Sequence, residues 1–171
     1  MTETIFEFLD FHAIHYIRAD HPPVFTCAEA RRLVPALAGA ETKNLFLRDG
    51  KGRRHFLVSV APEKNVDLRS LGQKLGVSGL SFASADRLKR YLNLEPGSVT
   101  LLGVINDTEY AVELIIDRDL WGSDAFLCHP LVNTSTLVME KSELCRFFEL
   151  TGHQCRILEI PGAVRKVLKP G

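Results

Sequence analysis

A lysine and an asparagine stand at the start of an otherwise apolar segment. Lys43 and Asn44 directly precede Leu45, Phe46 and Leu47. Neither polar side chain is needed for packing there, and an ammonium group beside an amide can hold phosphate and carbonyl oxygens. A lysine at the start of a strand is more often a simple exposed charge, because lysine is rarely buried. The pair is therefore a candidate for binding an oxygen-rich ligand.

Two other segments carry groups that could contact a ligand. Gly97, Ser98 and Gly103 belong to a stretch with glycines at both ends, which lets backbone N–H groups approach a ligand closely. A plain connecting turn fits the same residues equally well, since Pro-Gly is a routine turn signal. His129 precedes a proline, and Asn133 follows soon after. The imidazole could act in acid–base chemistry, place a ligand, or serve packing alone.

Several common kinds of site find no support in the sequence. No glycine-rich phosphate-binding loop follows a strand, so a doubly wound nucleotide fold is not expected. No serine has the G-x-S-x-G setting of a serine hydrolase. No carboxylate or cysteine completes a convincing metal site with His12, His15 and His21. The four cysteines lack C-x-x-C spacing, so we expect buried thiols, and we expect no metal or other cofactor.

Length and charge favour one compact domain. The 171 residues are 46% hydrophobic, which suits a single core over residues 1–171. The acidic N-terminus and the lack of a stretch of ~20 apolar residues predict a cytoplasmic protein without a membrane partner. Because Lys plus Arg equals Asp plus Glu at 21 each, only a local patch could hold a nucleic acid. Two basic clusters qualify, although solvated faces are the commoner explanation: Arg48, Lys51, Arg53 and Arg54, and Arg87, Lys89 and Arg90.

Capping signals and hydrophobic periodicity predict the helices and strands. Capping boxes open helices at Thr4 and Thr26, and Ser142 is expected to cap a helix that stops at Gly152. Two apolar runs flank a turn-forming cluster and predict a β-hairpin of residues 43–48 and 55–60 with a basic turn in solvent. The other predicted elements are helices over 66–75 and 84–92 and extended segments over 14–18, 110–117, 134–140 and 155–160. This set favours an α+β fold with a mixed, largely antiparallel sheet or partly closed barrel surrounded by helices.

Seven short motifs, taken in order, carry a family resemblance over nearly the whole chain. They are HPPVFT at 21–26, TKNLFL at 42–47, LSFAS at 80–84, PGSVT at 96–100, GVIND at 103–107, HP with NT at 129–134, and GH at 152–153. The chain resembles the YbaK-like editing domains of bacterial prolyl-tRNA synthetases, and most closely the freestanding Ala-tRNA(Pro) deacylases. It departs from them at Leu101-Leu102, where relatives commonly carry a proline, and this change bears on the shape of the glycine loop.

The resemblance implies hydrolysis of the ester that joins an amino acid to the terminal adenosine of tRNA, without a metal. Lys43 corresponds to the lysine on which family members rely, and it would bind the terminal phosphate or orient the substrate. Asn44 would fix the ester carbonyl, and His129 would complete the pocket wall. The substrate's own ribose hydroxyl would help to activate water, so the protein would mainly supply placement.

The resemblance also implies a substrate pocket. Backbone N–H groups of the glycine loop would stabilise the oxyanion as water adds. The walls of a narrow pocket would limit the size of the amino acid that can enter. The substrate-binding residues expected on this basis are Phe25, Thr26, Phe46, Gly97, Ser98, Gly103 and Asn133.

The implied substrate is alanine wrongly attached to tRNA(Pro), with prolyl-tRNA synthetase as a second expected partner. A proline-activating site excludes the smaller alanine poorly, because a missing methylene is worth only ~1–3 kcal/mol. Two alternatives stay open. One is a deacylase for another small ester, such as a cysteinyl or seryl ester, and the other is a noncatalytic module that binds tRNA or a synthetase.

Overall fold

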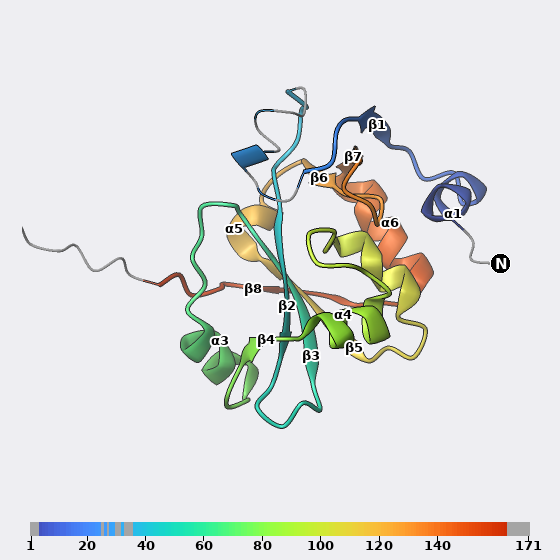
Figure 1. Ribbon diagram of the computed structural model, residues 1–171. Helices are drawn as coiled ribbons and strands as arrows, with labels where there is room; N and C mark the ends of the chain where they lie inside the picture. The colour runs from blue at the N-terminus through green and yellow to red at the C-terminus, as the bar shows by residue number, and fades with distance from the viewer. Residues whose placement is uncertain (1–3, 25, 27, 30–31, 33–35, 164–171) are drawn as a thin grey trace, which may run out of the picture.

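Two sheets with helices around them form the fold (Figure 1). The computed structural model describes residues 4–24, 26, 28–29, 32 and 36–163. The three-stranded sheet has the order β1 (Ile17–Asp20), β7 (Ser135–Glu140), β6 (Ala125–Cys128). The five-stranded sheet has the order β4 (Ser81–Phe82), β2 (Lys43–Arg48), β3 (His55–Val60), β5 (Val112–Asp117), β8 (Cys155–Leu158).

The strand pairings confirm a mixed, largely antiparallel α+β fold. Among the described residues, four of the six pairings between strands are antiparallel, and the pairs β3–β5 and β5–β8 are parallel. The predicted hairpin has the expected bounds, with Lys43 opposite Val60 and Arg48 opposite His55. Over the residues that the structure describes, a single bridge between Ala40 and Phe126 links the two sheets, so they do not form a closed barrel.

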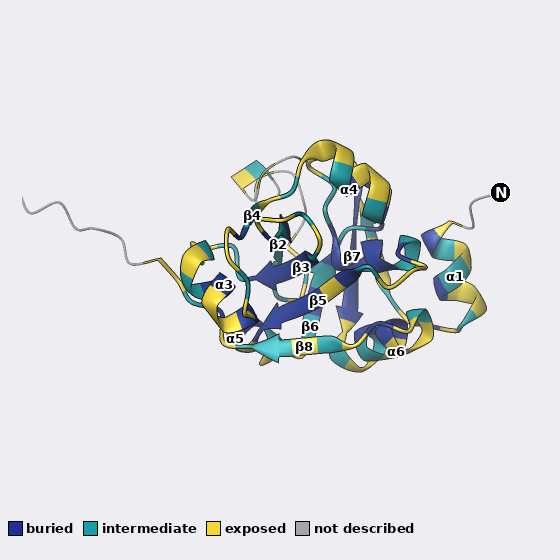
Figure 2. Ribbon diagram, turned by 90° about the horizontal axis from the view of Figure 1, so that it is seen from below, coloured by how far each residue is buried: buried dark blue, intermediate teal, exposed yellow. Residues whose placement is uncertain are grey.

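The central hairpin divides the core into two clusters, because successive strand residues point to opposite faces. Phe46 and Leu57 face the larger cluster, which includes side chains of the helices α1 (Ile5–Phe11), α4 (Ala85–Leu92) and α6 (Lys141–Thr151). Leu47 and Phe56 face the smaller cluster against α3 (Leu68–Leu75). In Figure 2, β3 and β5 are buried and β8 is only partly covered, so the central strands form a rigid frame for the residues at their ends.

Two of the predicted helix ends are confirmed, and one is wrong. The capping box of Thr4 and Glu7 opens α1, and Gly152, in the left-handed conformation, ends α6. The cap predicted at Ser142 is wrong, because α6 begins at Lys141 with Glu140 as its N-cap. Glu140 is still paired in β7 with Ala125 of β6, so the chain turns from strand to helix without a loop.

Some elements differ from the predictions or lie partly beyond the described residues. The Glu29 N–H donates to the Thr26 hydroxyl at 3.0 Å, as a capped helix requires, but much of the helix expected there lies outside the described residues. The sequence patterns missed four short elements: β4, β6, the 3₁₀ helix η1 (Leu101–Asn106) and the helix α5 (Arg118–Trp121). Each is too short to show a periodic apolar pattern.

Candidate active site at the start of strand β2

Lys43 and Asn44 point to opposite faces of the sheet, because they are neighbours on strand β2. The Lys43 ammonium donates to the backbone oxygen of Lys64, in the segment after β3. The Asn44 amide nitrogen lies 3.4 Å from both the Thr42 hydroxyl and the backbone oxygen of Val99, in the glycine loop. The two candidates therefore face different parts of the molecule across one end of the sheet.

A buried ion pair anchors the segment that holds the Lys43 ammonium. Lys64 Nζ lies 2.7 Å from Asp117 Oδ2 at the end of β5, and the Asp117 side chain is 1% exposed. Lys64 also donates to the Ile160 oxygen at 2.9 Å, while Asp117 accepts the Ile160 N–H at 3.0 Å. The carbonyl that receives Lys43 is thus fixed from two directions.

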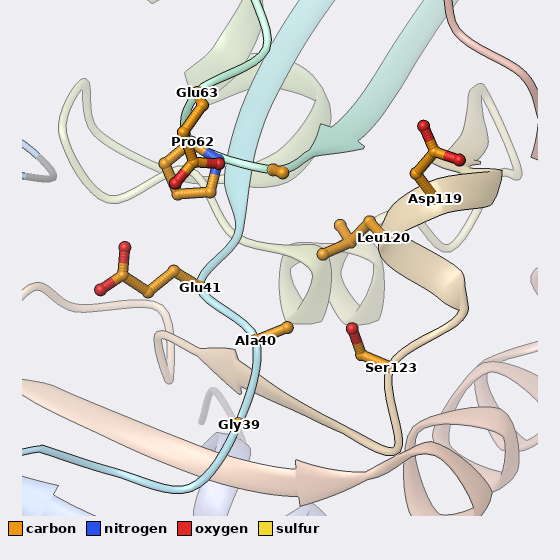
Figure 3. A pocket seen from close by; sticks show the side chains of 9 residues that line it. Gly39, Ala40, Glu41, Pro62, Glu63, Asp119, Leu120 and Ser123 are labelled. Atoms are coloured by element: carbon orange, nitrogen blue, oxygen red, sulfur yellow. The ribbon is translucent and has the colours of Figure 1, made fainter.

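A hollow of about 480 Å³ lies at the same end of the sheet (Figure 3). It is lined by Gly39, Ala40, Glu41, Ala61, Pro62, Glu63, Asp119, Leu120 and Ser123. These residues precede β2 or follow β3 and β5, and ligands commonly bind beyond the carboxyl ends of parallel strands. In Figure 3 the side chains of Ala40, Leu120 and Ser123 point into the hollow, whereas the carboxylates of Glu41 and Asp119 point away from it. The interior is therefore lined by small and apolar side chains with one hydroxyl.

None of these lining residues was predicted from the sequence. Alanine, proline and leucine carry no chemical signal, and their meeting depends on the pairing of three strands. The position of Asp119, two residues beyond the end of an apolar strand, was the one visible hint.

The glycine loop contacts the opposite face of β2. Gly97 is exposed and has a φ of +88°, and Ser98 N–H closes a turn to the Glu95 oxygen at 3.0 Å. Thr100 is buried, and its hydroxyl donates to the backbone oxygen of His129 at 2.7 Å. The loop thus joins Asn44, through Val99, to the segment that carries His129.

His129 carries a neutral imidazole of defined tautomer. Its Nδ1 lies 3.1 Å from the Ser135 backbone oxygen, which can only accept, so Nδ1 holds the proton and Nε2 has the free lone pair. Burial lowers the pKa of His129, the hydrogen bond to Ser135 opposes this shift, and the charge of His21 lowers the pKa further. The group is thus an acceptor near neutral pH.

His21 lies beside His129, a contact that its place in the HPPVFT motif did not indicate. Its ring centroid lies 6.5 Å from that of His129, and its Nε2 lies 2.8 Å from the Thr136 hydroxyl. The N–H of His21 donates to the Thr134 oxygen, which continues the pairing of β1 with β7. The two histidines are 108 positions apart, so only the strand pairing brings them together.

Two expected pocket residues lie in the packed interior instead. Phe46 is 5% exposed and stacks on His55, with 5.8 Å between ring centroids. Gly103 lies in η1, its N–H already donates to the Thr100 oxygen, and a Cβ there would come within 2.7 Å of Leu94. Packing explains why both positions are apolar or small, and neither lies open to a substrate.

The remaining expected contacts are placed as follows. Asn133 is partly exposed, and its backbone oxygen accepts the Val24 N–H at 3.2 Å. Thr26 is exposed and caps Glu29, while Phe25 lies outside the described residues. Among the described residues, no three histidine, cysteine, aspartate or glutamate side chains are arranged to hold a metal ion.

Comparison with known proteins gives the chain its class. The aminoacyl-tRNA editing domain family matches residues 21–147. The prolyl-tRNA editing protein ProX of Acetoanaerobium sticklandii is 38% identical over 152 residues, covering 89% of this chain and 93% of that protein. The chain therefore belongs to the aminoacyl-tRNA editing domain family, and it is an aminoacyl-tRNA deacylase.

Further relatives and solved structures agree with the fold. Prolyl-tRNA synthetase associated domain-containing protein 1 of Danio rerio is 39% identical over 154 residues, covering 89% of this chain and 83% of that protein. The crystal structure of hypothetical protein APE2540 superposes with a TM-score of 0.72 at 18% identity, over 92% of this chain and 99% of that one. In the part of the chain that the structure describes, no helix is long and apolar enough to cross a membrane.

Proposed function

We propose that this protein hydrolyses Ala-tRNA(Pro) in the cytoplasm, acting as one domain over residues 1–171 and releasing alanine from the terminal adenosine. One observation carries the proposal: a protein named for prolyl-tRNA editing is 38% identical along nearly the full length of both chains. The placement of Lys43, Asn44 and the glycine loop around one end of β2 supports it. Prolyl-tRNA synthetase is the expected partner, since it would produce the mischarged tRNA.

The reaction requires placement more than a strong base. The water oxygen bonds to the ester carbonyl carbon, the bond from that carbon to the ribose oxygen breaks, and the proton from water passes to the ribose oxygen. Lys43 would release the Lys64 carbonyl and bind the terminal phosphate, while Asn44 would hold the ester carbonyl. Backbone N–H groups near Gly97 would stabilise the oxyanion, and such donors are each worth ~10²–10³ in rate.

The neutral His129 fits a positioning role in this scheme. Its free Nε2 can accept a hydrogen bond from a ribose hydroxyl or from water near neutral pH. The ribose hydroxyl beside the ester can then relay the proton, so no carboxylate base is required. Correct orientation by itself can lower the barrier by ~7–11 kcal/mol.

The decisive experiment compares deacylation of Ala-tRNA(Pro) and Pro-tRNA(Pro) by the wild type and by Lys43→Ala. We expect rapid loss of alanine only, and a fall of about 10²-fold or more in kcat/KM for the variant. Lys74→Ala is the matched control, because Lys74 lies on α3 and donates to the backbone oxygen of Glu159, away from β2. Seryl and cysteinyl esters belong in the same panel.

The outcomes separate the alternatives. Preferential loss of serine or cysteine would replace alanine as the substrate. Binding of tRNA without hydrolysis of any ester would identify a binding module. Equal hydrolysis of alanyl and prolyl esters would refute size selection.

A further inference from the structure

Two basic segments that are far apart in the sequence meet at the turn between β2 and β3. A Cβ on Gly52 would lie 2.7 Å from Arg87 Nη2 and 3.1 Å from Arg48 Nη1, so both guanidinium groups crowd the same glycine. Arg87 also donates to the Gly52 oxygen at 3.2 Å. Glycine is required at this point because its φ is +66° and because a side chain would displace the guanidinium groups.

A third arginine completes the group. Arg90 lies over the Tyr91 ring, with 5.4 Å between its guanidinium carbon and the ring centroid. Tyr91 in turn lies against His55, with ring centroids 4.0 Å apart. We call Arg48, Arg87 and Arg90 the arginine cluster; Arg87 contacts His55 directly, and the charges of all three arginines act on that imidazole.

No carboxylate that the structure describes forms an ion pair with the arginine cluster. Within the described residues, no acid lies within 4.0 Å of any of the three guanidinium groups. Acids of the neighbouring segments bind other groups: Glu113 pairs with Arg54, Glu95 pairs with Lys89, and Asp49 accepts the backbone N–H groups of Arg53 and Arg54. Asp86 of α4 is exposed and forms no ion pair with the cluster.

The neighbouring histidine adds no positive charge to the arginine cluster. His55 Nε2 lies 3.0 Å from Arg87 Nη1, which can only donate, so this nitrogen is an acceptor. Burial lowers the pKa of His55, and the charges of Arg87, Arg48 and Arg90 lower it further, while Asp49 acts in the opposite direction. Lys51 and Arg53 are exposed in the same turn and strengthen the local field. Three arginines held together without an acid favour a polyanion on this surface.

The cluster lies on the face of β2 that also carries Asn44. Asn44, Phe46 and Arg48 alternate along that face, so Asn44 and Arg48 are roughly 13 Å apart along the strand. Helix α4, which carries the other two arginines, leads directly into the glycine loop (Figure 1). Phosphates of one stacked strand follow at ~3.4 Å along a helix axis, so this distance corresponds to a few nucleotides.

We propose that the arginine cluster binds phosphates of the tRNA acceptor end while the terminal adenosine lies at the start of β2. This inference rests on the proposed function for the position of the ester. Guanidinium groups match phosphate oxygens with paired hydrogen bonds, so the cluster fixes the direction in which the RNA strand leaves the site. It also gives a chain of zero net charge a local means of holding RNA.

The test measures binding of uncharged tRNA(Pro) at several KCl concentrations. We expect Arg48→Gln/Arg90→Gln to raise Kd about tenfold. The slope of log Kd against log[KCl] should fall by about 1.4, or ~0.7 for each lost phosphate contact. Arg69→Gln/Lys74→Gln is the matched control, since it removes two exposed charges from α3. Arg90→Gln alone, at an exposed helix position, keeps the test valid if the double variant does not fold.

A kinetic arm separates this proposal from the function on which it rests. Hydrolysis of alanyl-adenosine, which lacks the upstream phosphates, should be equal in wild type and cluster variant, while KM for Ala-tRNA(Pro) rises in the variant. If the wild type hydrolyses neither substrate, the proposed function fails, and the binding measurement still decides the role of the cluster. A Kd and salt dependence equal to those of the α3 control would overturn the inference.

Discussion

Asp117→Ala should weaken both the fold and the site, because this carboxylate anchors the segment that holds Lys43. The substitution leaves the Lys64 ammonium, which is 19% exposed, without its near partner, and it removes the acceptor of the Ile160 N–H. Removing one partner of a buried ion pair typically costs ~3–5 kcal/mol. Lys64 keeps the Ile160 carbonyl, so we expect a loss near the lower end, about 3 kcal/mol in the free energy of unfolding.

Asp119→Ala is the matched control, since Asp119 is the other carboxylate near the same ammonium. It lies 3.8 Å from Lys64 Nζ, and its side chain is 82% exposed. An exposed pair of this kind contributes about 0.5 kcal/mol or less. The Lys64 ammonium thus has one buried and one exposed carboxylate nearby, and the two variants compare their contributions.

Urea unfolding followed by circular dichroism measures both variants. With a denaturant dependence of about 2 kcal/mol per molar urea, Asp117→Ala should lower the midpoint by about 1.5 M and Asp119→Ala by about 0.25 M or less. The deacylation rate, measured without urea at low temperature, should also fall for Asp117→Ala, because the carbonyl that holds Lys43 loses its anchor. Equal midpoints for the two variants, or full activity of folded Asp117→Ala, would refute the reasoning.

Two further predictions concern stability. Burial, together with charges of nearby groups, lowers the pKa of both His55 and His129, so the unfolded chain binds more protons below pH ~6.5 and the free energy of unfolding should fall as pH drops from 7 to 5. Between pH 7 and pH 5, the urea midpoint of the double variant His55→Gln/His129→Asn should fall less than that of the wild type. An equal fall in both proteins would assign the pH dependence to other groups. Gly103→Ala should cost ~1–3 kcal/mol by overlap with Leu94, which is 1% exposed. Gly76→Ala, with open space but a φ of +71°, should cost only ~1–2 kcal/mol, and a thermal melt in which it is the worse variant would contradict the overlap argument.

Local signals in the sequence predicted the hairpin and most helix ends. The cluster Asp49-Gly50-Lys51-Gly52 set the turn, and its flanking runs gave the strand bounds without error. Ser84 and Asn93 likewise bound α4, as cap and left-handed end. These features depend on residues within one turn of each other, which is why they can be predicted from sequence. The cap predicted at Ser142 was wrong because the pairing of β7 with β6, which joins Glu140 to Ala125, fixes the start of α6.

The basic turn shows the same division between local and long-range information. The hairpin pattern predicted correctly that the turn exists, but not that Arg54 binds Glu113 through two contacts of 2.9 and 2.7 Å. It also did not predict that Arg48 meets Arg87. Glu113 lies 59 positions from Arg54, so nothing in the turn itself distinguishes the paired arginine from the unpaired ones.

The site is harder to predict than the fold, because its members come from segments joined only by strand pairing. Lys43 and Asn44 read as a single pair in the sequence, yet the two-residue period of a strand separates them, and this much the sequence alone could have shown. What it could not show is the partner of each: Val99 is 55 positions from Asn44, and the Lys64 carbonyl depends on the buried Asp117. An arrangement on two faces suits the proposed mechanism, in which the ribose hydroxyl relays the proton. One face would hold the phosphate and the other the ester carbonyl, so the start of β2 would set the distance between the two ends of the substrate.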